Sequence, residues 1–348
     1  LHLTDWIAGH DRPKAKLKIP DWQKFLPFEE ITLAEQFKAA GYATASIGKW
    51  HLTPGLKEGD EAYYPEKHGF DLNVGGYARG QPPSYHAPYK IPTLTEGPTG
   101  EFLTDREAAE AVKYIEANKE KPFFLYLPHY AVHTPLGGKP DVIAKYQAKA
   151  VKLPDLKQKN ATYAALVESV DDSLGTIRAA LKRLKLEENT IIVFTADNGG
   201  LLPITDNSPF RVGKGSAYEG GVRVPTLAWW PSKIAPGSVC DAVAGTIDVL
   251  PTCLKIAGAE VPATAERWAI EALFGVCPDG EKPAAFFRGG NMFQRRPQTV
   301  TRTKQDRRVQ LVQVLTYRRS LDGITAADVA RWTGLSEAEC ADALQREI

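Results

Sequence analysis

The sequence lacks a long apolar run, an excess of one charge and any closely spaced pair of cysteines. No uninterrupted hydrophobic stretch approaches the roughly 20 residues needed to cross a bilayer, so no membrane-spanning segment is predicted. The formal net charge of +1 gives no overall attraction to nucleic acid or to an anionic membrane. The four cysteines stand far apart without a C-x-x-C pair, which argues against a zinc site or a dense disulfide framework and favours buried thiols.

In place of those features, the chain has alternating helical and strand-like patterns. Apolar residues at a helical spacing predict helices at 30–40, 104–118, 160–184 and 248–257. Short apolar runs predict strands at 42–47, 123–127, 190–196 and 224–230. Thr104 and Glu107 form a candidate capping box for the second helix. This alternation is typical of an α/β fold in which helices cover both faces of a sheet.

Residues 55–100 are rich in glycine, proline and tyrosine and show no clear period. An irregular stretch of that length is uncommon in a compact domain unless it has a function, so we expect it to face a substrate. Within it, residues 75–89 are the candidate for substrate selection, and the side chains of interest are Tyr77, Arg79, Tyr85 and His86.

The character of the sequence changes after Pro262, and we divide the chain into 1–262, a catalytic domain, and 263–348, an atypical C-terminal segment. Between Arg295 and Arg319, eight basic residues stand against one acid. Residues 324–348 resemble a helix-turn-helix, with two merely packed helices as the alternative. Nucleic-acid binding by this segment is one functional hypothesis, and the near-neutral charge argues against it for the whole chain.

Polar residues follow the predicted strands, at the sheet edge where ligands bind in open α/β folds. Asp197 and Asn198 come directly after the strand at 190–196 and precede two glycines. A carboxylate and an amide oxygen side by side are ligands suited to Ca²⁺ or Mg²⁺, and glycines let the backbone approach a ligand closely. Because the same four residues also suit an ordinary turn, the pair is only a candidate metal site.

Cationic side chains follow the first two predicted strands. Lys49 and His51 alternate in Gly-Lys-Trp-His, a spacing that places both on one side of an extended segment. His133 follows the second strand, where His129 competes for the same role, and Lys214 lies between two glycines. An ammonium and an imidazole near an oxyanion neutralise charge and supply a proton to a leaving oxygen. Taken singly, each is more often an ordinary surface or loop residue than a site residue.

The order of these motifs resembles the sulfatase family, whose fold is α/β and alkaline-phosphatase-like. The family's second signature, a Gly-Tyr-x-Thr strand that ends in Gly-Lys-Trp-His, is matched at 41–51. Further matches follow in the family's order, namely His68-Gly69-Phe70-Asp71, Pro122-Phe123-Phe124-Leu125, His133-Thr134-Pro135, Asp197-Asn198-Gly199, Gly213-Lys214-Gly215, 219–225 and 248–252. The resemblance runs from about Asp5 to Pro262, and an ordered set of this length is far more specific than any single motif.

The resemblance implies a hydrolase of sulfate esters with a sheet flanked by helices on both faces. Asp197 and Asn198 would hold a divalent cation, usually Ca²⁺ in this family and with Mg²⁺ as the other option. The catalytic side chains in contact with the sulfate group would be Lys49, His51, His133 and Lys214. The expected partner is a sulfated small molecule or carbohydrate and not a membrane, and nucleic acid is disfavoured. The family resemblance implies a periplasmic or secreted protein.

One motif of the family has no counterpart in this sequence. Sulfatases of this kind carry Cys/Ser-x-Pro-Ser-Arg, whose first residue is matured to formylglycine and attacks sulfur, and no cysteine or serine here stands in that motif. The family's N-terminal pair of aspartates is absent too, and in the family both features lie upstream of the point that matches Leu1. We therefore expect an N-terminally truncated catalytic domain that lacks its first strand and is inactive in this form.

Two other functions stay open. The same fold can serve as a non-catalytic protein that binds sulfated ligands. A phosphatase or phosphodiesterase relative is the nearest enzymatic alternative, and such relatives use clusters of Asp and His to hold two metal ions. The Lys-Trp-His and Gly-Lys-Gly segments instead favour a sulfate monoanion.

Overall fold

The structure is a computed structural model that describes residues 25–153, 155, 157–240, 242–261 and 338. The chain divides into two compact units, one of Leu1–Ser238 with Val249–Arg267 and one of Val239–Asp248 with Trp268–Ile348. In the described part of the second unit, a 3-10 turn, η4 (Thr246–Asp248), is closed by the Gly245 N–H donating to Asp248 Oδ2 at 2.6 Å. The predicted segment 263–348, with its helix-turn-helix-like part, lies outside the described residues apart from Ala338.

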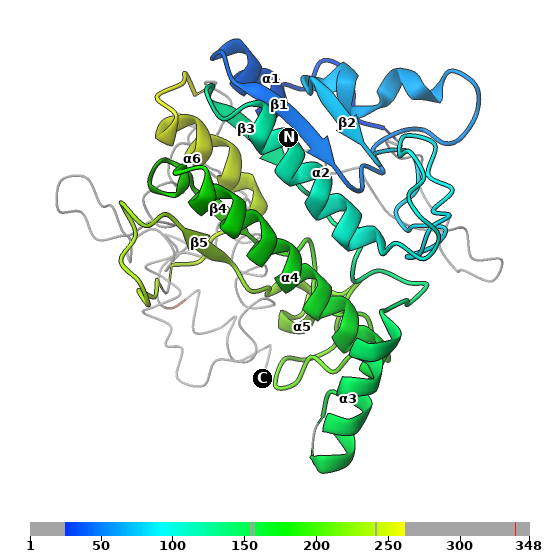
Figure 1. The fold of residues 1–348 in the computed structure, drawn as a ribbon. Helices are drawn as coiled ribbons and strands as arrows, with labels where there is room; N and C mark the ends of the chain where they lie inside the picture. The colour runs from blue at the N-terminus through cyan, green and yellow to red at the C-terminus, as the bar shows by residue number, and fades with distance from the viewer. Residues whose placement is uncertain (1–24, 154, 156, 241, 262–337, 339–348) are drawn as a thin grey trace. The chain divides into compact units, whose positions relative to one another are not determined.

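A three-stranded parallel sheet organises the first unit (Figure 1). β1 (Ala43–Ile47) lies between β2 (Leu72–Val74) and β3 (Phe123–Tyr126), and both neighbours run parallel to it. β4 (Ile192–Phe194) and β5 (Leu227–Trp229) form a separate antiparallel pair. The α/β class with a parallel sheet is confirmed, and all four predicted strands are present in shortened form.

Helices connect and cover these strands. They are α1 (Leu33–Ala39), α2 (Leu103–Ala117), α3 (Pro140–Lys152), α4 (Ala161–Arg183), α5 (Glu219–Val222) and α6 (Val249–Ile256). Short 3-10 turns occur at η1 (Asp60–Tyr63), η2 (Pro65–His68) and η3 (Glu187–Asn189). No helix among the described residues is long and apolar enough to cross a membrane.

Helices pack on both faces of the sheet, and the central strand β1 is almost wholly buried, which suits its apolar run. On one face, Ala45 and Ile47 of β1 pack with Ile115 of α2 and Leu181 of α4, and the two helices lie side by side in Figure 1. On the other face, β3 contributes Phe124, whose ring stacks 4.8 Å from that of Phe37 of α1. α6 lies beside α1 on this second face.

The predicted capping box of Thr104 and Glu107 is wrong. α2 begins at Leu103 after Phe102, which makes no side-chain cap, and both Thr104 and Glu107 are buried within the helix. The loop before the helix supplies the missing contact, because the Leu103 N–H donates to the Tyr85 carbonyl at 2.8 Å. The first helix has the real capping box, in which Thr32 and Glu35 exchange hydrogen bonds of 3.1 and 2.7 Å.

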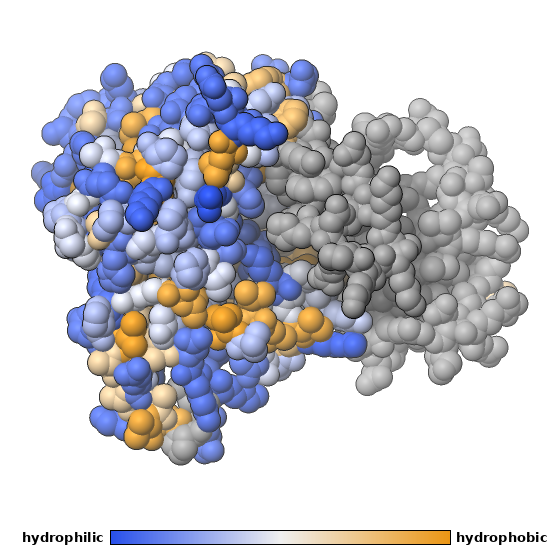
Figure 2. Space-filling model, turned by 90° about the vertical axis from the view of Figure 1, so that its right-hand side faces the viewer, coloured by the Kyte–Doolittle hydropathy of each residue, from blue (hydrophilic) through white to orange (hydrophobic). Residues whose placement is uncertain are grey.

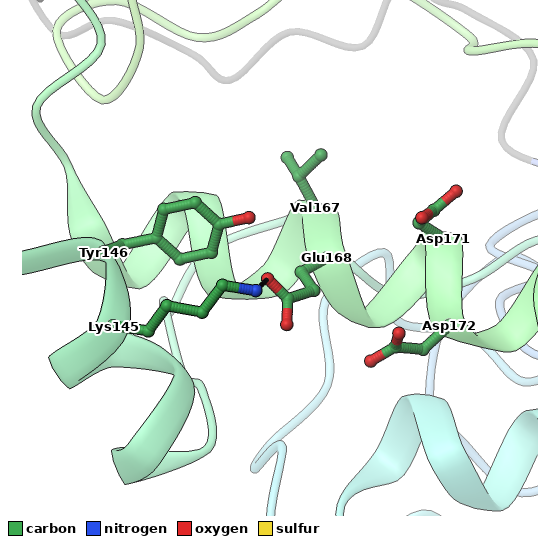
Figure 3. Close-up of a pocket in the computed structure, with 6 residues that line it drawn as sticks. All are labelled: Lys145, Tyr146, Val167, Glu168, Asp171 and Asp172. Atoms are coloured by element: carbon green, nitrogen blue, oxygen red, sulfur yellow. Dashed lines mark hydrogen bonds and ion pairs between the residues drawn. The ribbon is translucent and has the colours of Figure 1, made fainter. Parts of the chain in front are cut away.

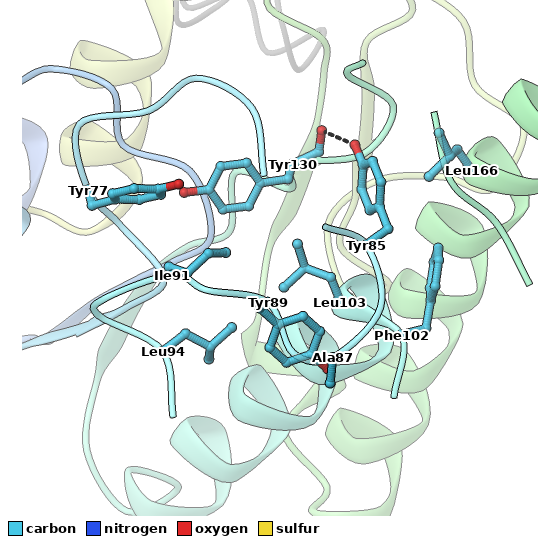
Figure 4. Close-up of a cluster of buried hydrophobic side chains, with 10 residues drawn as sticks. All are labelled: Tyr77, Tyr85, Ala87, Tyr89, Ile91, Leu94, Phe102, Leu103, Tyr130 and Leu166. Carbon is cyan, nitrogen blue, oxygen red and sulfur yellow. Dashed lines mark hydrogen bonds between the residues drawn. The ribbon is translucent and has the colours of Figure 1, made fainter. Parts of the chain in front are cut away.

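The irregular stretch before α2 folds into a core of its own, shown in Figure 4. Tyr77, Tyr85 and Tyr89 are buried there against Tyr130, and the Tyr85 hydroxyl donates to the Tyr130 carbonyl at 2.8 Å. The prediction that Tyr77 and Tyr85 select the substrate is therefore wrong, since their rings fill the interior. The dense tyrosine pattern reflects packing.

The other two residues proposed for substrate selection differ in exposure. Arg79 is exposed. His86 is half-buried, with its ring nitrogens 3.4 Å from the Gly100 carbonyl and 3.3 Å from the Gly138 carbonyl. Its ring also meets that of Phe102 edge-on at 5.1 Å. Arg79 alone of the four stays available to a ligand.

On the face shown in Figure 2, the described residues are mostly hydrophilic and apolar side chains gather in patches. Several strand residues remain exposed, among them Tyr126 of β3 at 43% and Leu227 of β5 at 61%. The shortened strands therefore do not bury every apolar side chain that the sequence places in them.

His68 is a fully buried histidine of the first unit. It has no exposed surface, its ring stacks 5.2 Å from Phe28 and lies 5.7 Å from Trp50, and neither ring nitrogen has a hydrogen-bond partner in the described part of the chain. Burial lowers the pKa of this imidazole below its ordinary 6.5, and Glu35 opposes the shift. The folded state therefore disfavours the protonated ring.

Replacement of His68 with leucine is expected to make the fold less sensitive to acid. The folded state binds fewer protons at His68 than the unfolded state. His68 therefore leaves the free energy of unfolding unchanged above about pH 6.5 and lowers it as the pH falls below that value. Urea unfolding at several pH values between about 7 and 5 measures the effect. An unchanged pH slope in the variant would contradict the prediction.

Candidate active site

The carboxyl ends of β1 and β3 meet at one edge of the sheet because these strands are parallel. The segment after β1 carries Lys49 and His51, and the segment after β3 carries His133. A hydrogen bond joins the two segments, since the Lys49 N–H donates to the Pro128 carbonyl at 2.7 Å. Three of the predicted site residues thus come from adjoining loops.

The backbone around Lys49 and His51 is tightly constrained. Gly48 has φ of +112°, and a Cβ added there would lie 2.3 Å from the Pro128 oxygen. His51 has a positive φ of 60°, an uncommon conformation for a residue with a side chain, and its N–H donates to the Tyr77 carbonyl at 2.9 Å. The buried tyrosine core therefore fixes the chain that presents both cationic side chains.

His133 is oriented by the same core. Its carbonyl accepts from the Tyr85 hydroxyl at 2.8 Å, and its N–H donates to the Tyr130 carbonyl at 2.9 Å. Within its own segment, His133 Nδ1 lies 2.7 Å from the Thr134 carbonyl oxygen. A carbonyl only accepts, so Nδ1 carries the proton and Nε2 is the nitrogen left for a ligand.

The loop after β4 carries Asp197 and Asn198 and is tied to the loop that carries Lys214. The Gly199 N–H donates to the Gly221 carbonyl at 2.9 Å, and the Lys214 N–H donates to the Gly200 carbonyl at 3.0 Å. A Cβ at Gly199 would lie 1.8 Å from the Gly220 oxygen, so only glycine allows this contact. The Asp-Asn-Gly-Gly segment is therefore more than an isolated turn.

Electrostatic coupling connects these three segments. Burial lowers the pKa of the half-buried Lys49, with Asp197 opposing and Lys214 reinforcing the shift. The pKa of His51 is lowered by burial and then by Lys49, His133 and Lys214. The five side chains thus share one electrostatic environment.

His133 shows the same pattern. Burial lowers its pKa, the hydrogen bond to Thr134 opposes that shift, and Lys214 and Lys49 lower the pKa further while Asp197 raises it. Positive groups thus crowd together and destabilise one another's charged forms. An anion placed among them would relieve that repulsion.

The structure separates the two histidines between which the sequence does not decide. His133 belongs to the group of Lys49, His51, His133 and Lys214, which we call the cationic cluster. His129 has other partners, since its Nδ1 lies 2.6 Å from Glu107 Oε2 and its Nε2 lies 3.1 Å from Ser173 Oγ. Glu107 is 3% exposed and was not recognised as a site-related residue from the sequence. Its position in the sequence gives no sign of this contact, since the partner is 22 residues away.

Asp197 and Asn198, the predicted ligands of a cation, each carry a side-chain oxygen. Asn198 Nδ2 donates to the Gly199 carbonyl at 2.9 Å, which leaves its side-chain oxygen available. The described residues contain no group of three or more His, Cys, Asp and Glu side chains that could hold a metal ion. Because Ca²⁺ takes about six to eight oxygen ligands, these two residues alone do not make a complete site.

An open groove between α3 and α4 does not contribute to this cluster. Its lining is Lys145, Tyr146, Val167, Glu168, Asp171 and Asp172 (Figure 3). Lys145 Nζ pairs with Glu168 Oε2 at 2.6 Å, which leaves two aspartates to give the groove a negative charge. That charge repels a sulfate group.

Comparison with known proteins identifies one family over most of this chain. The sulfatase family model matches residues 12–259. The chain is 35% identical over 295 residues to a sulfatase of Formosa agariphila, which covers 69% of this chain and 52% of that protein. It is 32% identical over 292 residues to the N-acetylgalactosamine-6-sulfatase of Sus scrofa, which covers 77% of this chain and 53% of that protein. The chain spans about half the length of these curated relatives.

A solved structure shows a similar fold. The crystal structure of Ps i-CgsB in complex with k-i-k-neocarrahexaose matches with a TM-score of 0.60 at 30% identity, over 73% of this chain and 59% of that one. Together with the family match over residues 12–259, this similarity shows that the chain belongs to the sulfatase family.

Proposed function

We propose that this chain forms the sulfate-binding part of a hydrolase of sulfate esters. The observation that carries the proposal is that Lys49 and His51 follow β1 and His133 follows β3, in loops that the Lys49 N–H to Pro128 carbonyl bond joins. Lys214 lies near enough to lower the pKa of all three side chains. The pKa of Lys49, His51 and His133 is lowered in the free chain, and an anion bound among them would favour their charged forms. A transition state that builds negative charge on sulfuryl and leaving oxygens suits such a cluster.

The four side chains divide the work by their chemistry. The ammonium groups of Lys49 and Lys214 neutralise and orient the sulfate oxygens as point charges. The imidazole of His133 presents Nε2, because its Nδ1 is engaged by the Thr134 carbonyl. Once protonated, His51 or His133 holds a proton that the leaving oxygen can take up.

Asp197 and Asn198 contribute two oxygen ligands to a divalent-cation site, for Ca²⁺ or Mg²⁺, in this proposal. Such a cation would add positive charge beside the sulfate group. The described residues alone do not complete its coordination shell, and the roles of the four side chains above do not depend on the cation.

A sulfated carbohydrate or small molecule is the proposed substrate class. The relative named N-acetylgalactosamine-6-sulfatase and the Ps i-CgsB structure that holds a neocarrahexaose support a carbohydrate. A periplasmic or secreted location is part of the same proposal.

The alternative function is non-catalytic binding of sulfated ligands. It is favoured by one observation, that no Cys/Ser-x-Pro-Ser-Arg motif occurs in the 348 residues. A phosphatase with two metal ions finds less support, since the described residues hold no cluster of three or more His, Cys, Asp and Glu ligands.

The 348-residue chain is expected to bind inorganic sulfate and to lose that binding when Lys49 or Lys214 becomes alanine. Loss of one charged hydrogen-bond donor costs about 1.5–3 kcal/mol, or roughly 10- to 100-fold in Kd by calorimetry. Lys119→Ala is the matched control, because Lys119 is an exposed lysine in the turn that precedes β3, at the opposite end of that strand. Equal affinity in Lys49→Ala and Lys119→Ala would refute the proposed site.

A turnover assay tests whether the chain can hydrolyse a sulfate ester by itself. We expect the purified chain to release no product from an aryl sulfate, because it contains no residue in the nucleophile motif. Measurable hydrolysis that Lys214→Ala abolishes would show that the chain uses another nucleophile. Sulfate binding without turnover by the chain fits either function, and measurable hydrolysis excludes the non-catalytic one.

A further inference from the structure

Beside the cationic cluster, the described residues hold a buried polar network that spans three elements. Glu107 of α2 is 3% exposed and accepts from His129 Nδ1 at 2.6 Å, and Ser173 of α4 is 2% exposed and lies 3.1 Å from His129 Nε2. A carboxylate only accepts, so the proton of this contact belongs to Nδ1. His129 therefore bridges two helices from the loop that follows β3.

A buried hydrogen bond between a carboxylate and an imidazole is weak evidence for stability. Desolvation of both groups offsets their attraction, and an apolar pair of similar size is often as stable. Glu107 Oε1, the second oxygen of the carboxylate, has no hydrogen-bond partner among the described residues. The network thus carries a desolvation cost that an apolar pair would avoid. This points to a role in holding the backbone around His129 in place.

The network adjoins the backbone of Gly48 and Lys49 through Pro128. His129 follows Pro128, whose carbonyl accepts from the Lys49 N–H at 2.7 Å. A Cβ at Gly48 would lie 2.3 Å from the Pro128 oxygen and 3.4 Å from Glu107 Oε1. A shift of the Pro128 carbonyl would therefore move the backbone that presents Lys49.

The same loop leads to His133. Tyr130, the residue after His129, donates its hydroxyl to the Gly75 carbonyl at 2.7 Å, and its own carbonyl accepts from the His133 N–H at 2.9 Å. The Tyr85 hydroxyl donates to the carbonyls of both Tyr130 and His133 at 2.8 Å. His129 is thus the hydrogen-bonded anchor at the start of a loop that further hydrogen bonds fix as far as His133.

We propose that Glu107 and His129 are positioning residues, whose buried contact sets the Pro128–Tyr130 backbone and thereby aligns Lys49 with His133 for one sulfate group. This inference rests on the proposed function, because the residues it aligns are those proposed to bind sulfate. Neither Glu107 nor His129 touches the sulfate group. Ser173 Oγ contacts Nε2 of the His129 imidazole, on the side of the ring away from Glu107.

The test compares variants that separate geometry from stability. His129→Asn keeps an N–H donor near the position of Nδ1, so it retains the bond to Glu107. His129→Phe removes that bond and leaves a buried, unpaired carboxylate, so this variant is expected only to report on folding. The double variant Glu107→Leu/His129→Phe replaces the pair with apolar groups and is expected to fold cooperatively.

Two readouts are taken on each folded variant, the Kd for inorganic sulfate and the NMR resonances of the Lys49 amide and the His133 ring. We expect the double variant to lose about tenfold or more in sulfate affinity and to shift both resonances. His129→Asn should stay within about threefold of the native Kd, because the Glu107 contact persists. Ser173→Ala is the milder control, since it removes only the Nε2 contact.

A double variant that folds, binds sulfate like the native chain and leaves both resonances unchanged would overturn the positioning role. The resonances need no ligand, so they also decide the inference if the native chain fails to bind sulfate. In that case the proposed function fails, while displaced Lys49 and His133 resonances in the double variant would still show that the pair sets this geometry.

Discussion

Replacement of Gly48 with alanine is expected to destabilise the fold by about 3–5 kcal/mol, a large effect for a single substitution. Gly48 has φ of +112°, which costs a residue with a side chain about 1–3 kcal/mol. The new Cβ would also lie 2.3 Å from the Pro128 oxygen, so the Lys49–Pro128 hydrogen bond must break or the loop must move. Urea unfolding of the variant measures the loss.

Gly41→Ala is the matched control for this prediction. Gly41 also has a positive φ, +84°, and nothing lies within 4 Å of a Cβ built there. This variant bears the strain of the backbone conformation without a collision, so we expect it to lose about 1–3 kcal/mol. If Gly48→Ala loses no more than Gly41→Ala, the close approach to Pro128 does not constrain the fold.

Local patterns predicted the fold class well, because strand and helix periods appear in short windows of sequence. The parallel strands β1 and β3 were found in this way. The antiparallel pairing of β4 with β5 was not predicted, since an apolar run of a few residues looks the same in either direction.

The residues of the candidate site were predictable for a similar reason. Lys49, His133 and Asp197 each follow a strand, and Lys214 lies between glycines, so each one carries a local signal. The structure adds the contacts that join these segments, such as the bond from the Lys49 N–H to the Pro128 carbonyl. Their roles toward sulfate stay predictions.

The residues that support the site were misread because their partners are distant in the sequence. Glu107 stands three residues after Thr104, the spacing of a capping box, yet its carboxylate is paired with His129. Tyr77 and Tyr85 lie in a loop-like stretch, and their burial depends on Tyr130, which follows a different strand. Composition alone does not distinguish a tyrosine that packs from one that binds.

Sulfate affinity is expected to rise steeply as the pH falls. In the free chain, burial and the nearby cations hold the pKa of His51 and of His133 below the ordinary 6.5. A bound sulfate favours the protonated rings, so each pKa rises on binding and the complex takes up protons. Each proton taken up strengthens binding by up to about tenfold per pH unit.

The sign follows from which state binds more protons. The complex holds more than the free chain in the window between the lowered free pKa and the raised bound pKa, so affinity increases as the pH falls through that window. Lys49 and Lys214 lower the pKa of both rings, and Asp197 raises the pKa of His133. Calorimetry in buffers of different ionisation enthalpy counts the protons directly.

Variants identify the groups that titrate. His133→Gln and His51→Gln should each flatten the pH profile by the contribution of one ring, whereas Lys119→Ala should leave it unchanged. Without sulfate the same histidines make the fold less stable as the pH falls below about 6.5, because the unfolded state binds more protons there. The stabilisation by a fixed concentration of sulfate must therefore grow toward acid, and a constant thermal shift from about pH 7.5 to 5.5 would contradict the cationic pocket.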